Sequence, residues 1–187
     1  PQSYYKMPAP QTQQENCVAH NGSLIPIPGR TIMVQAWYQG GLSVFEWTDP
    51  KHPHEIAFFD RGPNTQGGGG FWSVYYYNGL IIGTEMLRGL GIFELMPSAA
   101  ISQNEIDAAK SVHMDWLNAQ DQPKFIWPAS FALSRSYTDQ LERWKGLTAD
   151  KVSAVRTALS GAESMSGSAR RDALNALSTQ VSSYTSD

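Results

Sequence analysis

The sequence predicts an antiparallel β region followed by an α-helical region, and three observations support this division. Part of the first region repeats itself, since Gly41-Leu-Ser-Val-Phe-Glu-Trp47 returns as Gly89-Leu-Gly-Ile-Phe-Glu-Leu95. Aromatic and β-branched residues, punctuated by Gly, Pro, Asn and Asp, dominate residues 17–97, a composition that favours short strands. After Met96-Pro97 the apolar spacing changes to that of helices.

The repeat indicates which β architecture to expect. Each copy follows a short apolar run and a turn, so the repeated unit comprises several short strands. A unit of roughly 40–50 residues built in this way is typical of a β-propeller blade, which buries its faces by stacking on neighbours around an axis. The predicted fold class is therefore a β-propeller fragment (about two four-stranded antiparallel blades, the second incomplete) followed by an α-helical bundle.

Composition and charge argue against several classes of partner. The net charge of −3 and the lack of a Lys/Arg-rich tract argue against binding to nucleic acid or to an anionic membrane. No apolar run approaches the roughly 18 residues that a membrane span needs. The chain opens with Pro1, as expected of a processed product or a fragment. Cys17 is the only cysteine, so we expect a buried free thiol or a bond to a cysteine of another segment.

The first repeated unit is expected to be a four-stranded meander. Residues 1–16 are polar and rich in Pro and Gln, which favours an extended lead-in segment without regular structure. Four apolar runs follow, each ended by turn residues, and they predict strands at 24–27, 32–38, 42–47 and 55–60. These strands amount to the sheet of one blade.

The second unit is expected to have three strands. Asn78-Gly79 is a strong hairpin signal because both residues tolerate positive φ, and it separates predicted strands at 71–77 and 80–86. A third strand is predicted at 90–95, and no outer fourth strand follows it. The β-propeller blades are thus assigned to residues 17–97.

The remaining chain is expected to be helical. Residues 98–127 are assigned to a helix and a linker because Ser102-Gln-Asn-Glu105 is a capping box. Residues 128–187 are assigned to a three-helix bundle, since short links join helices that each carry one apolar stripe. The stripes consist of Leu133, Tyr137, Leu141 and Trp144, then Val152, Val155, Leu159 and Ala162, then Leu174, Leu177 and Val181.

Candidate ligand-binding residues lie where the first strand of the first unit begins. His20 and Asn21 precede that strand, and in a propeller this position is close to the central channel, where ligands bind. A histidine facing the channel could ligate a metal or act as an acid or base near neutral pH. The alternative is a structural histidine with satisfied hydrogen bonds.

Two further candidates lie in the second unit. Glu85 stands on an otherwise apolar strand, where a carboxylate faces solvent, binds a ligand or pairs with a neighbour such as Arg88. Trp72 belongs to an aromatic-rich region that includes Trp37 and Trp47. Exposed aromatic rings stack on sugars or bind partners, whereas buried ones fill the space between blades.

A metal site has weaker support. His52 and His54, with Asp49 nearby, could form a small cluster, since histidines two apart on a strand point the same way. No third ligand is evident in that segment, and the adjoining Asp-Pro corner is well explained as a rigid turn. The metal ligands are therefore unassigned.

Several of these segments resemble a known family. Gly41–Pro50, closing through Pro53, resembles the LVIVD repeat, a strand of the type LVIVDVSDPxxP, and Gly89–Leu95 matches the strand but lacks the Asp-Pro corner. Similarity to the C-terminal end of bacterial, largely actinobacterial, LVIVD-repeat proteins extends over Asn16–Gly22, Val34–Tyr38, Ile56–Gly62 and Gln122–Ser130. The resemblance implies a β-propeller that is secreted or surface-exposed. It also implies inner strands that often open with His, which His20 fits and Phe71 does not.

Together these observations predict the C-terminal part of a secreted or cell-surface LVIVD-repeat β-propeller. It is expected to act as a non-catalytic binding or scaffolding module without a cofactor. Its expected partners are upstream propeller blades of the same protein and a protein or glycan ligand. The alternatives are a metal-dependent enzyme with a divalent metal in the central channel and a carbohydrate-binding propeller.

Overall fold

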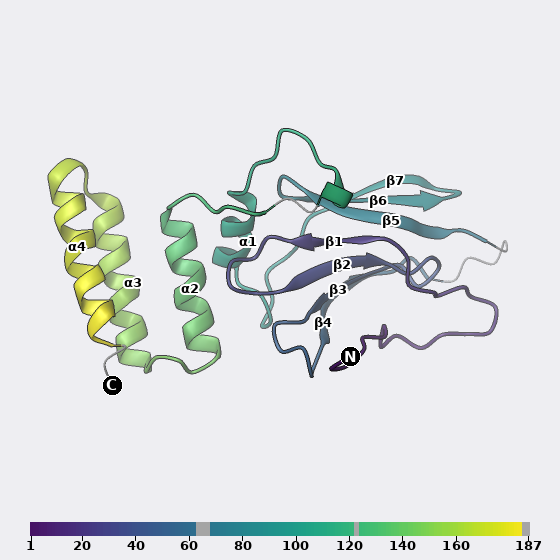
Figure 1. The fold of residues 1–187 in the computed structure, drawn as a ribbon, viewed down its shortest axis with the longest axis horizontal. Helices are drawn as coiled ribbons and strands as arrows, with labels where there is room; N and C mark the ends of the chain where they lie inside the picture. Colours follow the sequence, from purple (N-terminus) through teal and green to yellow (C-terminus); the bar gives the residue numbers. More distant parts are fainter. Residues whose placement is uncertain (63–67, 122–123, 185–187) are drawn as a thin grey trace. The chain divides into compact units, whose positions relative to one another are not determined.

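The computed structural model describes residues 1–62, 68–121 and 124–184. The chain divides into two compact units, Pro1–Trp127 and Pro128–Asp187. Within these described residues, the first unit holds all the strands and one α-helix, and the second holds three α-helices (Figure 1).

The first four strands form one antiparallel sheet in sequence order. They are β1 (Gly22–Ile25), β2 (Ile32–Ala36), β3 (Leu42–Glu46) and β4 (His54–Phe59). The register places Ile25 opposite Ile32 and Val34 opposite Val44, so that aliphatic side chains line up on one face. The expected four-stranded meander is therefore confirmed, with boundaries that differ by one or two residues.

The next three strands form a separate antiparallel sheet, again in sequence order. They are β5 (Gly70–Tyr77), β6 (Leu80–Met86) and β7 (Gly89–Phe93). Within the described part of the chain no fourth strand joins this sheet. The repeated segments are accordingly the third strands of two different sheets, β3 and β7.

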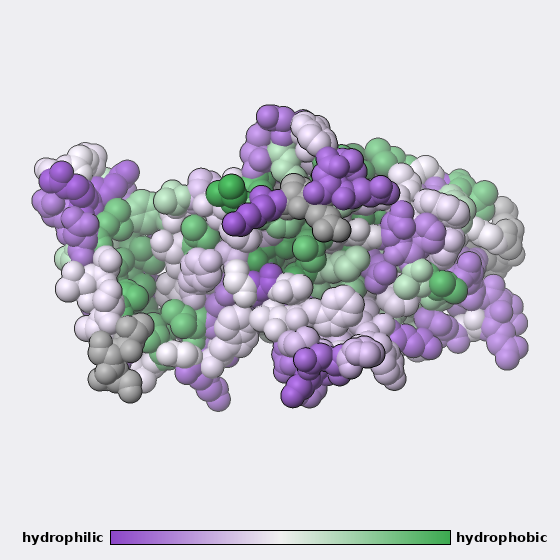
Figure 2. Space-filling view, viewed as in Figure 1, coloured by the Kyte–Doolittle hydropathy of each residue, from purple (hydrophilic) through white to green (hydrophobic). Residues whose placement is uncertain are grey.

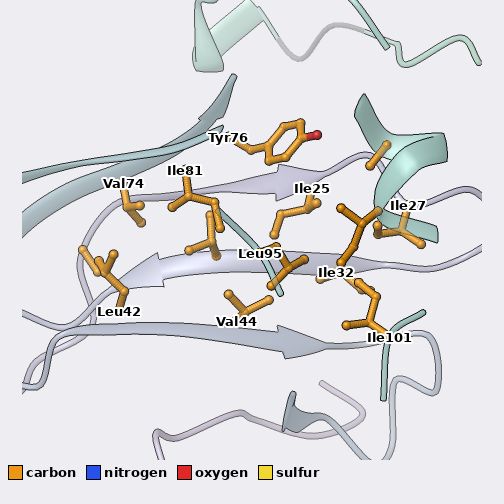
Figure 3. Close-up of a cluster of buried hydrophobic side chains, with 14 of the residues drawn as sticks. Ile25, Ile27, Ile32, Leu42, Val44, Val74, Tyr76, Ile81, Leu95 and Ile101 are labelled. Carbon is orange, nitrogen blue, oxygen red and sulfur yellow. The ribbon is translucent and has the colours of Figure 1, made fainter. Parts of the chain in front are cut away.

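The two sheets of the first unit pack face to face. Strand β5 lies against β1 and β2, and the backbone N–H of Tyr76 donates to Ser23 Oγ at 2.7 Å. Between the sheets lies a hydrophobic core (Figure 3). Within this core Val34 and Val74 are fully buried. Burying each such side chain stabilises the fold by about 1.5–3 kcal/mol, and this core fixes how the two sheets meet.

The other face of the first sheet is covered by the N-terminal segment, in which no helix or strand occurs up to Asn21. The Tyr5 ring stacks on Phe45 with centroids 4.0 Å apart. The Tyr5 hydroxyl shares a hydrogen bond of 2.6 Å with the Ser43 hydroxyl. Met7 is also buried. The segment thus packs on the β3 side chains that point away from the second sheet.

Helix α1 (Gln103–Lys110) begins at the capping box that the sequence predicts, with Ser102 as N-cap and Glu105 completing the box. Its residues Ile106 and Ala109 join the core between the sheets. A short 3-10 helix, η1 (Ala119–Asp121), follows. The indole N–H of Trp127 then donates to the backbone oxygen of Pro26 at 2.7 Å, which ties the end of the first unit to the loop after β1.

The second unit comprises α2 (Phe131–Arg143), α3 (Ala149–Ser164) and α4 (Gly167–Ser183), and α3 packs against both other helices. The predicted stripe on α3 is buried throughout. On α2, however, the predicted stripe stays largely exposed, since Tyr137, Leu141 and Trp144 are 44%, 38% and 51% accessible. Tyr137 and Leu141 line an apolar groove of about 360 Å³ together with residues of α3 and α4, which accounts for the exposure of these two side chains. Hydrophobic residues on this unit are visible in Figure 2.

Candidate binding site at the junction of the two sheets

The two sheets are joined by a bridge between Tyr38 and Phe71. The Tyr38 N–H donates to the Phe71 oxygen at 3.1 Å, and the Phe71 N–H donates to the Tyr38 oxygen at 2.8 Å. Tyr38 has a φ of 48°, which is uncommon for a residue with a side chain. A Cβ on Gly70 would lie 2.0 Å from the Tyr38 carbonyl carbon, so only glycine permits this approach. The chain thus adopts unfavourable backbone geometry to make this junction.

The imidazole of His20 lies beside the rings of Tyr38 and Trp72. The centroid of His20 is 4.9 Å from that of Tyr38 and 4.5 Å from that of Trp72, and the latter two are 5.7 Å apart. The backbone of His20 is held on both sides. Its N–H donates to Ala36 O at 2.8 Å, and its carbonyl accepts from Gln35 Nε2 at 3.0 Å. The three rings form an aromatic cluster whose histidine has a fixed backbone.

Trp72 reaches this cluster because β5 is irregular at that point. The register between β5 and β6 shifts between Phe71 and Ser73, which leaves Trp72 without a partner in the ladder. Such a bulge redirects the side chain of the extra residue. Trp72 is 48% accessible, so part of this residue is open to a ligand.

The ring nitrogen Nδ1 of His20 is buried and forms no hydrogen bond with any described residue. A buried polar atom without a partner costs about 1–3 kcal/mol, which makes it an unusual feature in a folded protein. Among described side chains the same is true only of Trp37 Nε1 and the Tyr76 hydroxyl. One of these three unpartnered groups thus lies within the aromatic cluster.

The structure brings two of the four predicted site residues, His20 and Trp72, into contact. Asn21 follows His20 in the chain, and its Nδ2 donates to the Tyr75 hydroxyl at 3.4 Å. Glu85 lies opposite Phe71 in the ladder and takes no part in the aromatic cluster. Its carboxylate is buried and forms ion pairs of 3.2 Å with Arg61 and 3.1 Å with Arg88, the partner that the sequence suggested.

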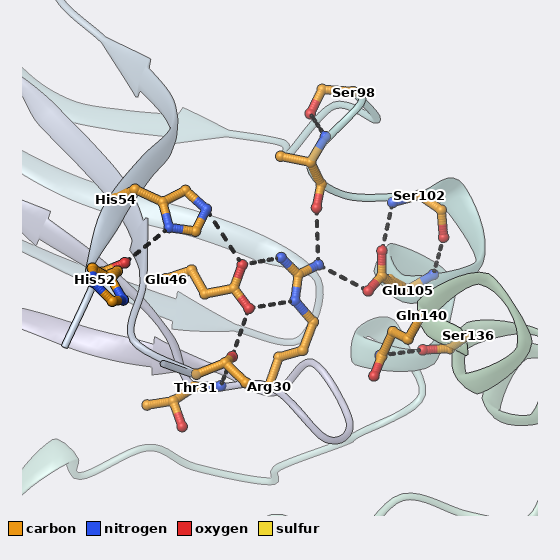
Figure 4. Close-up of polar contacts among 12 residues, drawn as sticks. Arg30, Thr31, Glu46, His52, His54, Ser98, Ser102, Glu105, Ser136 and Gln140 are labelled. Carbon is orange, nitrogen blue, oxygen red and sulfur yellow. Dashed lines mark hydrogen bonds and ion pairs between the residues drawn. The ribbon is translucent and has the colours of Figure 1, made fainter. Parts of the chain in front are cut away.

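Sequence analysis missed Tyr38 as a member of the site. The available signal was Gly40-Gly41 after a predicted strand, which marks a tight turn but does not indicate the positive φ of Tyr38. It also missed a buried ionic cluster around Arg30 (Figure 4). There Arg30 donates from Nε to Glu46 at 2.9 Å and from Nη1 to Glu105 at 2.8 Å.

This ionic cluster also explains the electrostatics of Glu46. Burial raises the pKa of the Glu46 carboxyl, but hydrogen bonds from Arg30 and Thr48 and the Arg30 charge outweigh burial and hold it below its usual value. Arg30 also donates to the backbone oxygen of Ala100 at 3.0 Å. Because its contacts join a loop, a strand and a helix, we interpret the cluster as stabilising the fold rather than as a binding site.

The histidines considered for a metal do not converge. His52 Nδ1 lies 2.7 Å from Asp49 on the surface, whereas His54 Nε2 lies 3.7 Å from Glu46. In the part of the chain that the structure describes, no group of three or more His, Cys, Asp or Glu side chains could hold a metal ion.

The first unit also contains a pocket of about 390 Å³, away from the aromatic cluster. It is lined mainly by apolar residues that include Leu24, Met33 and Phe125. Tyr76 also lines it, and burial raises the pKa of Tyr76 to about 12. A pocket of this size and lining suits a small apolar ligand. It lacks the exposed aromatic ring and the histidine of the site formed by His20, Tyr38 and Trp72, which we call the junction site.

No family model, curated protein or solved structure matches the chain. Of the helices within the described ranges, none has the length and apolarity to cross a membrane.

Proposed function

We propose that the chain is part of a β-propeller of the LVIVD-repeat type and that it acts as a non-catalytic binding or scaffolding module, secreted or at the cell surface. The observation that supports this most is the equivalence of the two sheets. Each is an antiparallel meander in sequence order, and the repeated segments occupy its third strand. The first strands, β1 and β5, lie against each other, as the inner strands of neighbouring blades do around a propeller axis.

The junction site is the proposed point of ligand contact. It lies where the first strands of the two sheets meet, and it combines the half-exposed Trp72 with His20 and Asn21. An indole face next to hydrogen-bonding groups suits the apolar face and the hydroxyls of a sugar ring. Carbohydrate binding is therefore the second candidate function, favoured by the exposure of Trp72.

Binding of glycans to the full chain tests this site. A soluble glycan array and insoluble cell-envelope polysaccharide are the probes, and Trp72→Ala is the variant. The matched control is Trp116→Ala, which removes an indole that is 66% exposed elsewhere in the first unit. We expect Trp72→Ala to weaken binding about fivefold or more, since one aromatic stacking contact contributes about 1–3 kcal/mol. Equal loss in both variants would contradict a ligand site at the junction.

The architecture has its own test. An experimental structure of the complete gene product should show the two sheets as successive wedges around one axis, with β1 and β5 nearest to it. A closed two-sheet sandwich, with no further sheet stacked on either outer face, would contradict the propeller proposal.

A further inference from the structure

The free edge of β7 has the properties of a pairing surface. On one side β7 pairs with β6, and on the other no backbone hydrogen bond joins it to any described segment. Its sequence, Gly89-Leu-Gly-Ile-Phe93, has neither a charge nor a proline. Leu90 and Ile92 are 63% and 59% accessible. Natural edge strands are normally protected by charge, proline or a cover, so an unprotected apolar edge indicates a partner.

The equivalent strand in the first sheet is covered. There β3 pairs with β4 along its length, with Leu42 opposite Phe59 and Val44 opposite Ala57. In the second sheet β7 holds the place of β3 but has no such neighbour within the described residues (Figure 1). The missing partner is thus one more antiparallel strand.

The sequence around β7 is complementary to itself in antiparallel pairing. If two copies of β7 pair about a two-fold axis at Gly91, Leu90 of each copy lies opposite Ile92 of the other. The same register places Arg88 opposite Glu94, so that a cation meets an anion at both ends of the interface. Paired residues share one face of a sheet, and the exposed aliphatic side chains of both copies would therefore form one continuous apolar strip.

Arg88 and Glu94 are both available for an ion pair with the second copy. Glu94 is 60% exposed, and its nearest cation, Lys110, is 3.8 Å away. Arg88 contacts Glu85, but Arg61 also pairs with that carboxylate, so two cations share one anion. The second copy would supply the missing negative charge next to Arg88.

We propose that β7 is a self-association edge, through which two copies of this chain form a two-fold symmetric dimer in the register centred on Gly91. The two three-stranded sheets would become one continuous sheet, with the same patch used by both subunits. This inference depends on the edge and its charges alone, and it holds whether or not the chain is part of a propeller.

Cross-linking tests the register directly. In a Cys17→Ser background, Leu90→Cys and Ile92→Cys are purified separately and oxidised alone and after mixing. Opposed residues in antiparallel strands have Cα atoms about 4.5–5.5 Å apart, within reach of a disulfide. We expect dimers from the mixture at several times the yield from either variant alone. Equal yields in all three samples, or no dimer in any, would overturn the proposal.

A charge exchange tests the ends of the interface. Glu94→Lys opposes like charges at both ends, so we expect the dimer dissociation constant to rise about tenfold, as two exposed ion pairs allow. Arg88→Glu combined with Glu94→Lys should restore it. Asp115→Lys is the matched control, since this carboxylate is 94% exposed and outside the interface. Sedimentation equilibrium gives the constants, and thermal melting checks that each variant is folded. A wild-type monomer at every concentration would refute the dimer.

Discussion

Arg30 and Glu105, 75 positions apart in the sequence, form a buried ion pair in which Nη1 of Arg30 donates to Oε1 of Glu105 at 2.8 Å. The Glu105 side chain is fully buried and the Arg30 side chain is 1% accessible. Glu105 also accepts the backbone N–H of Ser102 at 2.7 Å, completing the capping box of α1. One carboxylate therefore both starts the helix and attaches it to the first sheet.

Replacing the shared cation should destabilise the first unit strongly. Arg30→Met leaves the Glu46 and Glu105 carboxylates buried without their cation, and we expect a loss of about 3–5 kcal/mol in the free energy of unfolding. Urea denaturation measures this loss. Arg171→Met is the control because its side chain is 71% accessible. If Arg30→Met unfolds at the same urea concentration as the control, the cluster does not stabilise the fold.

The same cluster predicts a pH dependence. Despite burial, Arg30 and Thr48 hold the pKa of Glu46 below its usual value of 4.5. A carboxyl whose pKa is lower in the folded state stabilises the fold above its unfolded pKa, and this stability is lost as the pH falls through the folded pKa. The free energy of unfolding should therefore fall as the pH drops below about 4.5.

Glu46→Gln isolates this contribution from that of the other carboxylates. The variant should be less stable than the wild type at neutral pH, and the difference should shrink as the pH falls, because protonation removes the same charge from wild-type Glu46. Urea denaturation at a series of pH values measures both curves. A difference that stays constant with pH would show that the Glu46 charge is not responsible.

The sequence predicted the elements of this fold better than the contacts between them. Alternating apolar residues and turn residues such as Asn78-Gly79 are local signals, and they located each of the seven strands that the described residues form. The contact of His20 with Trp72 depends on a β-bulge and on the positive φ of Tyr38, and neither has a strong local signal. The Arg30–Glu105 pair joins distant segments, so spacing along the chain could not reveal it. Similarly, the apolar periodicity of α2 predicted the helix but not the groove that its Tyr137 and Leu141 line.

The N-terminal segment should contribute to stability through Tyr5. Removing the ring that stacks on Phe45 should cost about 2 kcal/mol, so Tyr5→Ala should unfold at a lower urea concentration than the wild type. Tyr5→Phe keeps the ring but loses the hydrogen bond with Ser43, and it should cost about 1 kcal/mol. Tyr4→Ala is the control because this neighbour is 85% accessible. Equal effects at the two positions would show that the segment does not pack on the sheet.

The Tyr5 hydroxyl also provides a spectroscopic check. The pKa of Tyr5 is raised to about 12, chiefly by burial; the hydrogen bond with Ser43 lowers it in part, and the Glu55 carboxylate adds to the rise. Tyr76 also has a pKa of about 12, so an absorbance titration of tyrosinate should show one late-titrating group fewer in Tyr5→Phe than in the wild type. The same titration of Tyr4→Phe should keep that group. If Tyr5→Phe keeps as many late-titrating groups as the wild type, the Tyr5 hydroxyl is not buried against the sheet.

The junction between the sheets should be most sensitive at Gly70. Its φ is 85°, and an added Cβ would lie 2.0 Å from the Tyr38 carbonyl carbon, so Gly70→Ala must break the Tyr38–Phe71 bridge. We expect a loss of about 3 kcal/mol or more. Gly68→Ala is the matched control, since Gly68 has a φ of 81° but no atom within 4 Å of the added Cβ, and it should cost only about 1–2 kcal/mol.

Fluorescence connects this loss to the candidate site. Breaking the bridge moves Tyr38 and Phe71, which flank Trp72, so Gly70→Ala should change the emission of the Trp72 indole, whereas Gly68→Ala should leave it unchanged. Trp72→Phe in each background identifies the part of the signal that belongs to this residue. If the two alanine variants match in both stability and emission, close backbone approach at Gly70 does not position the aromatic cluster. The strained backbone at Tyr38 would then have no part in forming the site.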